Sequence, residues 1–213
     1  DYKFSPFSEA ASIGVEKFQQ QSSDWAKPEL EKAEKHGLIP GILQGADLTR
    51  PITREEFCEL SVLMVEKATG KTAEAAASNP FNDTSNPQIL KAYKLGITAG
   101  TSPNTFSPKV LINREQCAAM LFRAIKVIKP DGNYSIAGIS NFPDQKYISA
   151  YAVEATKYMA KTGIIKGDTA GNFMPKATTS AQEAAGYGMA TREAAVLMSV
   201  RSYEKVPSIE TAS

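Results

Sequence analysis

Two short phrases of the sequence place an arginine beside a glutamate where a helix is expected to begin. They read Ile52-Thr53-Arg54-Glu55 and Ile112-Asn113-Arg114-Glu115. A guanidinium group offers a planar pair of donors that fits a carboxylate or a phosphate, and the backbone N–H groups at a helix start favour the same anions. An arginine in this place is more often solvated or salt-bridged, so the phrases alone leave anion binding and a surface role open.

The sequence offers no recognisable set of side chains for catalysis. It contains one histidine and two cysteines, too few for a metal cluster of these ligands, and no nucleophile–base–orienter set can be traced. Paired carboxylates stay open, because any fold can bring two acids together. We predict a protein that is not an enzyme and that holds neither metal nor cofactor. Cys58 and Cys117 fall on apolar faces of expected helices, which favours buried free thiols over a disulfide.

The charges are balanced, with 24 Lys and Arg against 23 Asp and Glu and a net charge of +1. This balance argues against a general nucleic-acid or membrane-surface role, so an anion bound here must be recognised by a few placed groups. No apolar run is long enough to cross a bilayer, and we expect no membrane insertion. The chain starts at Asp1 without a recognisable signal peptide, which we interpret as a mature or excised terminus, compatible with secretion.

A glycine phrase occurs three times and indicates an internal repeat. Each copy begins with glycine followed by Leu or Ile and ends with glycine: Gly37–Gly41, Gly96–Gly100 and Gly163–Gly167. A helix-like stretch precedes each copy, and a second helix is expected after it. Thr53 and Asn113 are natural caps for two of these second helices. Their apolar positions agree at an offset of 60 residues and follow the spacing of one buried helical face.

The third copy departs from the other two. Phe173-Met174-Pro175-Lys176 matches Phe106-Ser107-Pro108-Lys109, and the same offset of 67 then puts Ala181 at the place of Arg114. We therefore predict that the third repeat lacks the Arg-Glu pair and that its pocket is weak or silent. Arg192 lies 29 residues after Gly163, where 18 are expected, or about 16 Å too far along a helix. We assign Arg192 to the surface or the bundle.

These motifs resemble the S-layer homology family over residues 22–203. The residues that carry the resemblance are Trp25-Ala26, Phe81-Asn82-Asp83, Phe142-Pro143-Asp144, the three glycine loops, Phe106-Ser107-Pro108, Phe173-Met174-Pro175 and the two arginine phrases. The resemblance implies an all-α fold in which three tandem repeats form a pseudo-threefold, three-pronged spindle around a central helical bundle. One such repeat has too small a hydrophobic core to be stable alone, whereas three repeats can share one core.

The boundaries that we expect are an N-terminal helix at 1–21, repeats at 22–72, 79–132 and 139–203, and a tail or linker at 204–213.

The resemblance also implies a ligand, a secondary cell-wall polysaccharide held in grooves between repeats through a sugar with a pyruvate ketal. We expect Arg54 and Arg114 to bind its carboxylate, Gly41 and Gly100 to let the sugar approach the main chain, and Trp25 to pack on the sugar ring. The alternatives to ligand binding are that the glycines only end helices and that Trp25 lies in the core.

The resulting prediction is a secreted, non-catalytic anchor at the bacterial cell surface, cell wall or S-layer. Its partner would be an acidic, pyruvylated glycan, with no nucleic acid, and the chain would belong to a larger S-layer protein or exoprotein. Two alternatives stay open: a protein-interaction scaffold of the cell envelope, since stacked helix pairs often present binding surfaces, and a cell-wall-degrading enzyme.

Overall fold

The computed structural model describes residues 21–213 and is helical, with isolated bridges but no sheet in this part of the chain. The all-α prediction is confirmed. The helix expected at 1–21 falls, apart from Gln21, outside the described residues. The helices are α2 (Lys27–Lys35), α3 (Arg54–Thr69), α4 (Pro87–Lys94), α5 (Arg114–Ile128), α6 (Val153–Lys161), α7 (Ser180–Ala184) and α8 (Arg192–Lys205).

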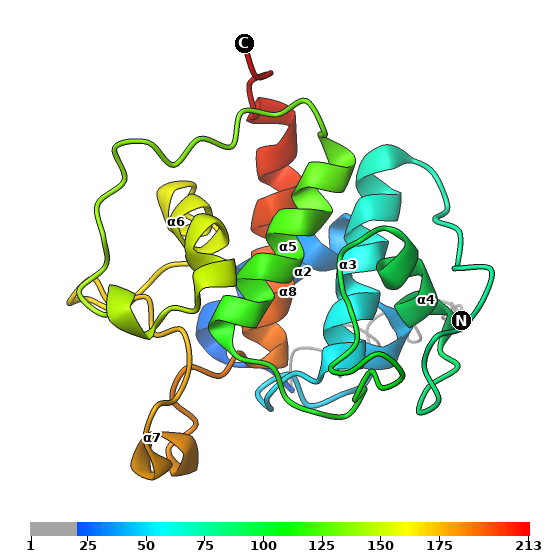
Figure 1. Cartoon of the computed structure of the whole chain (residues 1–213), viewed down its shortest axis with the longest axis horizontal. Helices are drawn as coiled ribbons and strands as arrows, with labels where there is room; N and C mark the ends of the chain where they lie inside the picture. Colours follow the sequence, from blue (N-terminus) through cyan, green and yellow to red (C-terminus); the bar gives the residue numbers. More distant parts are fainter. Residues whose placement is uncertain (1–20) are drawn as a thin grey trace, which may run out of the picture.

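The three longest helices, α3, α5 and α8, pack against one another at the centre of the molecule (Figure 1). Their facing side chains are fully buried, and they include Phe57, Leu60, Cys117 and Val200. The short helices α2, α4 and α6 lie outside this bundle and contribute Leu30, Ile89 and Met159 to the same core. The three repeats therefore share one hydrophobic core, as their small size requires.

Each short helix packs on the long helix of the preceding repeat rather than on that of its own repeat. Helix α4 packs on α3, and α6 packs on α5. Helix α2 of the first repeat packs on α8 of the third, so the order of packing is cyclic. This cyclic exchange is the structural basis of the threefold pattern in the sequence, and it puts a junction between repeats beside every long helix.

The long helices begin with the same cap. The side chains of Thr53, Asn113 and Thr191 each accept a hydrogen bond from the backbone N–H three residues further on. The caps at Thr53 and Asn113 were predicted. The third corrects the sequence analysis, because Arg192 and not Ala181 begins the long helix of the third repeat.

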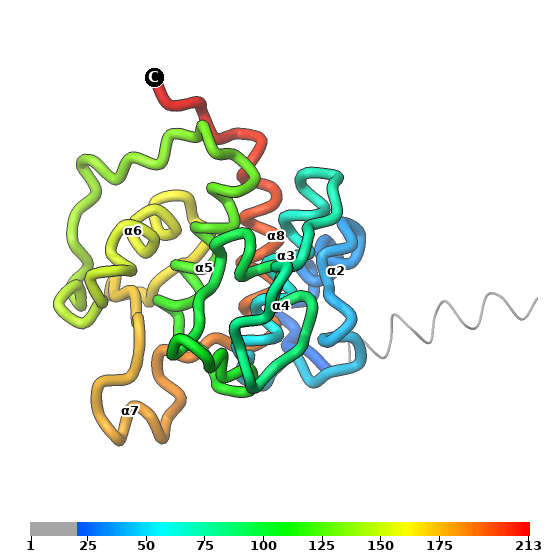
Figure 2. The backbone as a smooth tube through the Cα atoms, turned by 45° about the vertical axis from the view of Figure 1, so that its right-hand side comes forward, coloured from blue at the N-terminus to red at the C-terminus, as the bar shows by residue number. Residues whose placement is uncertain are grey.

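The error at Arg192 has a simple cause. The segment between Gly163 and Arg192 contains an additional short helix, α7, which projects away from the bundle in both views (Figures 1 and 2). A constant offset placed the arginine position inside α7, at Ala181. Since α7 is an insertion in the third repeat, the Arg-Glu pair is present there as Arg192-Glu193, after the inserted residues.

The first glycine of each repeated phrase ends a helix. Gly37, Gly96 and Gly163 have φ angles of +66°, +73° and +73°, in the left-handed region that favours glycine.

At the C-terminal end, where a tail or linker was predicted, Asn133 N–H donates to the Glu210 carbonyl and Ala212 N–H to the Asp131 carbonyl. Residues 206–213 thus lie against the loop that follows α5.

Both cysteines are free and buried, as predicted. Burial raises the pKa of the Cys58 and Cys117 thiols to about 12, so both stay protonated near neutral pH.

Candidate functional site: grooves between repeats

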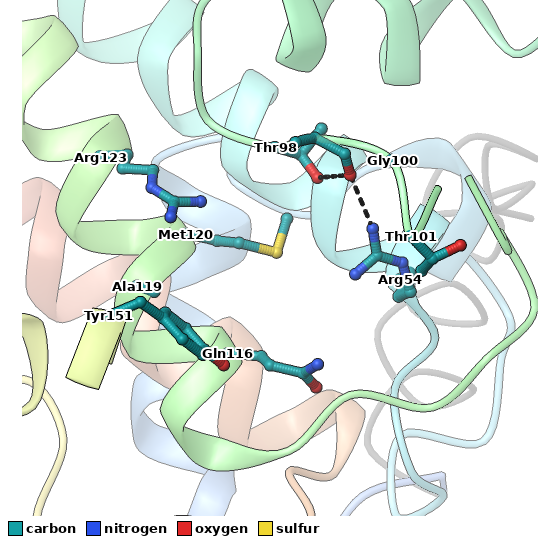
Figure 3. A pocket seen from close by; sticks show the side chains of 10 residues that line it. Arg54, Thr98, Gly100, Thr101, Gln116, Ala119, Met120, Arg123 and Tyr151 are labelled. Atoms are coloured by element: carbon teal, nitrogen blue, oxygen red, sulfur yellow. Dashed lines mark hydrogen bonds between the residues drawn. The ribbon is translucent and has the colours of Figure 1, made fainter. Parts of the chain in front are cut away.

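The first groove lies where the start of α3 meets the glycine loop of the second repeat. It encloses about 290 Å³ and is closed on its other sides by α5 and by Tyr151 of the third repeat. Arg54 and Arg123 lie on opposite sides of the cavity, with Met120 between them in the view of Figure 3. Its lining is made of Arg54, Thr98, Ala99, Gly100, Thr101, Gln116, Ala119, Met120, Arg123 and Tyr151.

Arg54 is held in this groove by backbone carbonyls. Its Nε donates to the Phe106 carbonyl at 3.0 Å and one Nη to the Ala99 carbonyl at 3.0 Å. The guanidinium carbon lies 4.6 Å from the centre of the Phe106 ring. No carboxylate of residues 21–213 forms an ion pair with Arg54. Burial lowers the pKa of Arg54, yet an arginine stays protonated, so the groove holds a cation without a counter-charge.

The Phe-x-Asp motif fixes the carbonyl that holds Arg54. The carboxylate of Asp83 accepts hydrogen bonds from Phe106 N–H at 2.9 Å and from Ser107 N–H at 2.8 Å. Ser107 has a φ of +62°, a left-handed conformation that is unusual for a residue with a side chain. Asp83 thus stabilises a strained turn and sets the direction of the Phe106 carbonyl, a role that the sequence analysis did not assign.

Gly100 is required by the packing of its own loop. A Cβ atom at this position would lie 2.3 Å from the Ser102 carbonyl oxygen, much closer than a real contact. Gly167 is confined in the same way, by the Asn172 carbonyl at 2.1 Å. At Gly41 a Cβ atom would meet nothing within 4 Å. The two predicted glycines therefore differ, and only Gly100 is confined by the backbone around it.

The second groove repeats the first one repeat further along. It encloses about 150 Å³ between Arg114 at the start of α5, residues 164–166, α8 and Trp25. Arg114 donates through Nε to the Phe173 carbonyl at 3.1 Å and through one Nη to the Lys166 carbonyl at 2.7 Å. Burial lowers its pKa. Within the described part of the chain, Arg114 too has no carboxylate partner.

Each of these grooves has a second arginine that the sequence analysis missed. Arg123 lines the first groove and Arg201 the second, each nine residues after the arginine that begins its helix. Arg201 is neutralised by Glu29, with distances of 2.8 and 2.5 Å. Arg123 donates to the Ile97 carbonyl at 3.3 Å and forms no ion pair with any described residue. Counting along the helices from each Arg-Glu pair could have found both.

An aromatic side chain stands at the mouth of each groove. Trp25 is 63% exposed, so it belongs to the wall of the second groove and not to the core. Tyr151 is 54% exposed and has the same place in the first groove. Both lie twelve residues before the first glycine of their repeat, a register that could have identified Tyr151.

The glutamate of the Arg-Glu pair positions these aromatic residues. Glu115 accepts hydrogen bonds from Ser149 N–H at 2.9 Å and from its hydroxyl at 2.8 Å. Glu193 accepts the same pair from Ser23, at 2.8 and 2.6 Å. Each serine precedes the aromatic residue by two positions, so both glutamates fix the start of the following repeat. The sequence analysis assigned no role to these glutamates.

Comparisons with known proteins match two segments of the chain to one family. The S-layer homology domain matches residues 82–118 and 141–185. These two matched segments are S-layer homology domains. The domain is a non-catalytic anchoring unit, which indicates a location at the cell surface or cell wall. No helix within residues 21–213 is long and apolar enough to cross a membrane.

Three curated proteins share most of the chain. It is 28% identical over 180 residues to the Exoglucanase XynX of Acetivibrio thermocellus, 27% over 191 residues to an amylopullulanase of Thermoanaerobacterium thermosulfurigenes and 26% over 169 residues to an endoglucanase of Bacillus sp. (strain KSM-635). These alignments cover 81%, 86% and 78% of the chain but only 16%, 10% and 17% of the relatives. The aligned region is thus a small part of each of these longer proteins.

The third groove of the S-layer homology repeats is different. It encloses about 440 Å³ beside Gly41, and its lining includes Glu59, Glu66 and Lys67 but no arginine. Arg192, the third arginine of the set, instead donates two hydrogen bonds to the carboxylate of Glu56. This contact raises the pKa of Arg192.

The distances are 2.6 Å from Nε and 2.8 Å from Nη2 of Arg192 to the two oxygens of Glu56. The reason given from the sequence for a silent third pocket, a missing arginine, is therefore wrong. The arginine is present, and an acid neutralises it.

Proposed function

We propose that this chain is a non-catalytic anchor that binds an acidic secondary polysaccharide of the bacterial cell wall. The first and second grooves would each bind the carboxylate of a sugar, most simply that of a pyruvate ketal. Arg54 and Arg114 would be the carboxylate ligands, and Tyr151 and Trp25 would pack against the sugar ring. The secreted protein to which the chain belongs would be attached to the wall through these contacts.

The observation that carries this proposal is that the arginine at the helix start in each of the first two grooves, Arg54 or Arg114, has no carboxylate partner among residues 21–213. A partly buried charge is costly unless it is paired and hydrogen-bonded. Nε and Nη2 of Arg54 are directed by carbonyls, whereas its Nη1 makes no hydrogen bond within the described residues. The edge formed by Nη1 and Nη2 therefore stays open for a carboxylate, which binds arginine best through two parallel hydrogen bonds.

The relatives support an anchor more than a catalyst. An exoglucanase, an amylopullulanase and an endoglucanase share this region, and it makes up at most 17% of each. A segment common to proteins with different activities fits a task that is independent of the reaction. Attachment to the wall is such a task, because it would place different catalytic domains at the same surface.

The proposal is tested by sedimentation with purified, protease-treated cell walls. Arg54→Ala and Arg114→Ala should each weaken binding by about 2 kcal/mol, or roughly 30-fold, because each removes a charge-assisted pair. Arg50→Ala, which changes an exposed arginine outside both grooves, is the matched control and should bind like the wild type. Circular dichroism checks that the variants fold.

Three results would contradict the proposal. Equal binding of all variants would remove the arginines from the site. Binding that disappears when the walls are treated with protease would indicate a protein partner and favour the scaffold alternative. Release of soluble sugar from the walls by the chain would favour the enzyme alternative.

A further inference from the structure

A further cavity of about 680 Å³, the outer cavity, adjoins the first groove. Thr98, Ala99 and Arg123 line both cavities, so the two meet along one edge. The other walls of the outer cavity come from residues 76–77, in the connection after α3, and from Tyr93 near the end of α4. The wall at 76–77 is tied to α4, because Ala76 N–H donates to the Leu90 carbonyl at 3.2 Å.

We propose that the two cavities form one extended site for an acidic oligosaccharide. The acidic sugar would occupy the first groove, and the sugars linked to it would continue past Arg123 over the ring of Tyr93. This inference rests on the proposed function and adds to it a ligand of several residues and a second subsite.

The charges along this path suit an acidic chain. Neither cavity has an aspartate or a glutamate in its lining. Arg123 lies at the junction without an ion pair among the described residues. Lys94 also lines the outer cavity, and Glu74 neutralises it at 2.7 Å. The free positive charge is therefore concentrated at Arg54 and Arg123, at the inner end of the path, and this places the acidic sugar there.

The outer cavity offers an ordered aromatic surface. Tyr93 is 39% exposed, and its ring packs edge-on against Phe81, with centres 5.3 Å apart and an angle of 77° between the planes. Phe81 in turn packs on Phe106 at 5.3 Å, the residue whose carbonyl holds Arg54. A ring fixed in this way loses little entropy when a sugar packs on it, and the contacts join both cavities into one packed unit.

Size and register set the first groove apart from the second. Ligand pockets enclose roughly 300–1,000 Å³. The first groove, with about 290 Å³, is at the lower limit of this range, whereas the outer cavity, with about 680 Å³, lies well within it. Tyr93 lies three residues before Gly96, and the same place before Gly163 is taken by Ala160. In the second groove Glu29 also neutralises the second arginine. Within residues 21–213, the extension thus belongs to the first groove and not to the second.

Calorimetry on the whole chain with two probes tests this inference. The short probe is the methyl glycoside of one pyruvate-ketal hexose, and the long probe is a tetrasaccharide that carries the same ketal at its end. Because only the long probe reaches the outer cavity, Tyr93→Ala should weaken its binding about fivefold or more and leave the short probe unchanged. Tyr93→Phe should keep the ring contact and bind both probes like the wild type.

Tyr147→Ala is the matched control, since Tyr147 is 42% exposed and lines neither cavity. It should leave both affinities unchanged. Equal effects of Tyr93→Ala on the two probes, or no effect on either, would overturn the extended site while leaving the anchor intact. Failure of Arg54→Ala to weaken either probe would contradict the proposed function itself, and the inference with it.

Discussion

At the scale of single residues, the second glycines of the repeated phrase have different physical roles. Gly100 is confined by backbone oxygens, whereas Gly41 has open space where a side chain would begin. Gly100→Ala should lower the free energy of unfolding by about 1–3 kcal/mol, because backbone has to move to admit the methyl group. Gly41→Ala should change it by less than about 0.5 kcal/mol. Urea unfolding of both variants measures this difference, and equal effects would contradict it.

The pair formed by Arg192 and Glu56 is predicted to be structural. Its side chains are 22% and 7% exposed, so removing one partner leaves a poorly solvated charge. Arg192→Ala should lower the free energy of unfolding by about 1–3 kcal/mol and leave wall binding unchanged.

A double-mutant cycle with Glu56→Gln should give a coupling of similar size. Loss of wall binding in a folded Arg192→Ala variant would show that the third arginine is a ligand after all.

At the scale of elements, Asp83 connects the Phe-x-Asp motif at the start of the second repeat to the strained turn at Ser107. The pKa of Asp83 is lowered from its ordinary value, because its carboxylate accepts hydrogen bonds from the N–H groups of Phe106 and Ser107. A lowered pKa in the folded state means that the stabilisation is present above the ordinary pKa and is lost as the pH falls through the lowered value.

The melting temperature of the wild type should therefore exceed that of Asp83→Asn at pH 6. The difference should shrink below pH 4 and approach zero in stronger acid. Thermal unfolding followed by circular dichroism between pH 2 and pH 7 measures both proteins. A difference that stays constant down to pH 2 would show that the charge of Asp83 is not what holds the turn.

The elements also show where reading from the sequence succeeds and fails. The caps at Thr53 and Asn113 and the buried faces of α3 and α5 follow from local rules of spacing and hydrogen bonding, and the sequence predicts them. The start of α8 does not follow, because the inserted helix α7 breaks the constant offset on which the prediction depended. The partners of Glu193 and Glu115 could not be predicted either, because they lie in another repeat, at Ser23 and Ser149.

At the scale of the whole molecule, the cyclic packing of short helices on the preceding repeat creates the grooves. The periodicity of a helix shows that one face is buried but not which repeat covers it, so this exchange could not be predicted. The exchange explains why Arg54 meets the loop of the second repeat and Arg114 that of the third. It also explains why Trp25, near the start of the described chain, completes a groove on α8 near its end.

The proposed anchoring depends most on the binding of a carboxylate of the wall polysaccharide by Arg54 and Arg114. The most direct measurement is the affinity of the chain for that polymer before and after mild acid removes its ketal pyruvate.

The wild type should lose at least about 30-fold in affinity on treatment, down to the level of the Arg54→Ala/Arg114→Ala double variant on the untreated polymer, and the double variant should be insensitive to the treatment. Equal affinity of the wild type for both polymers would contradict the account.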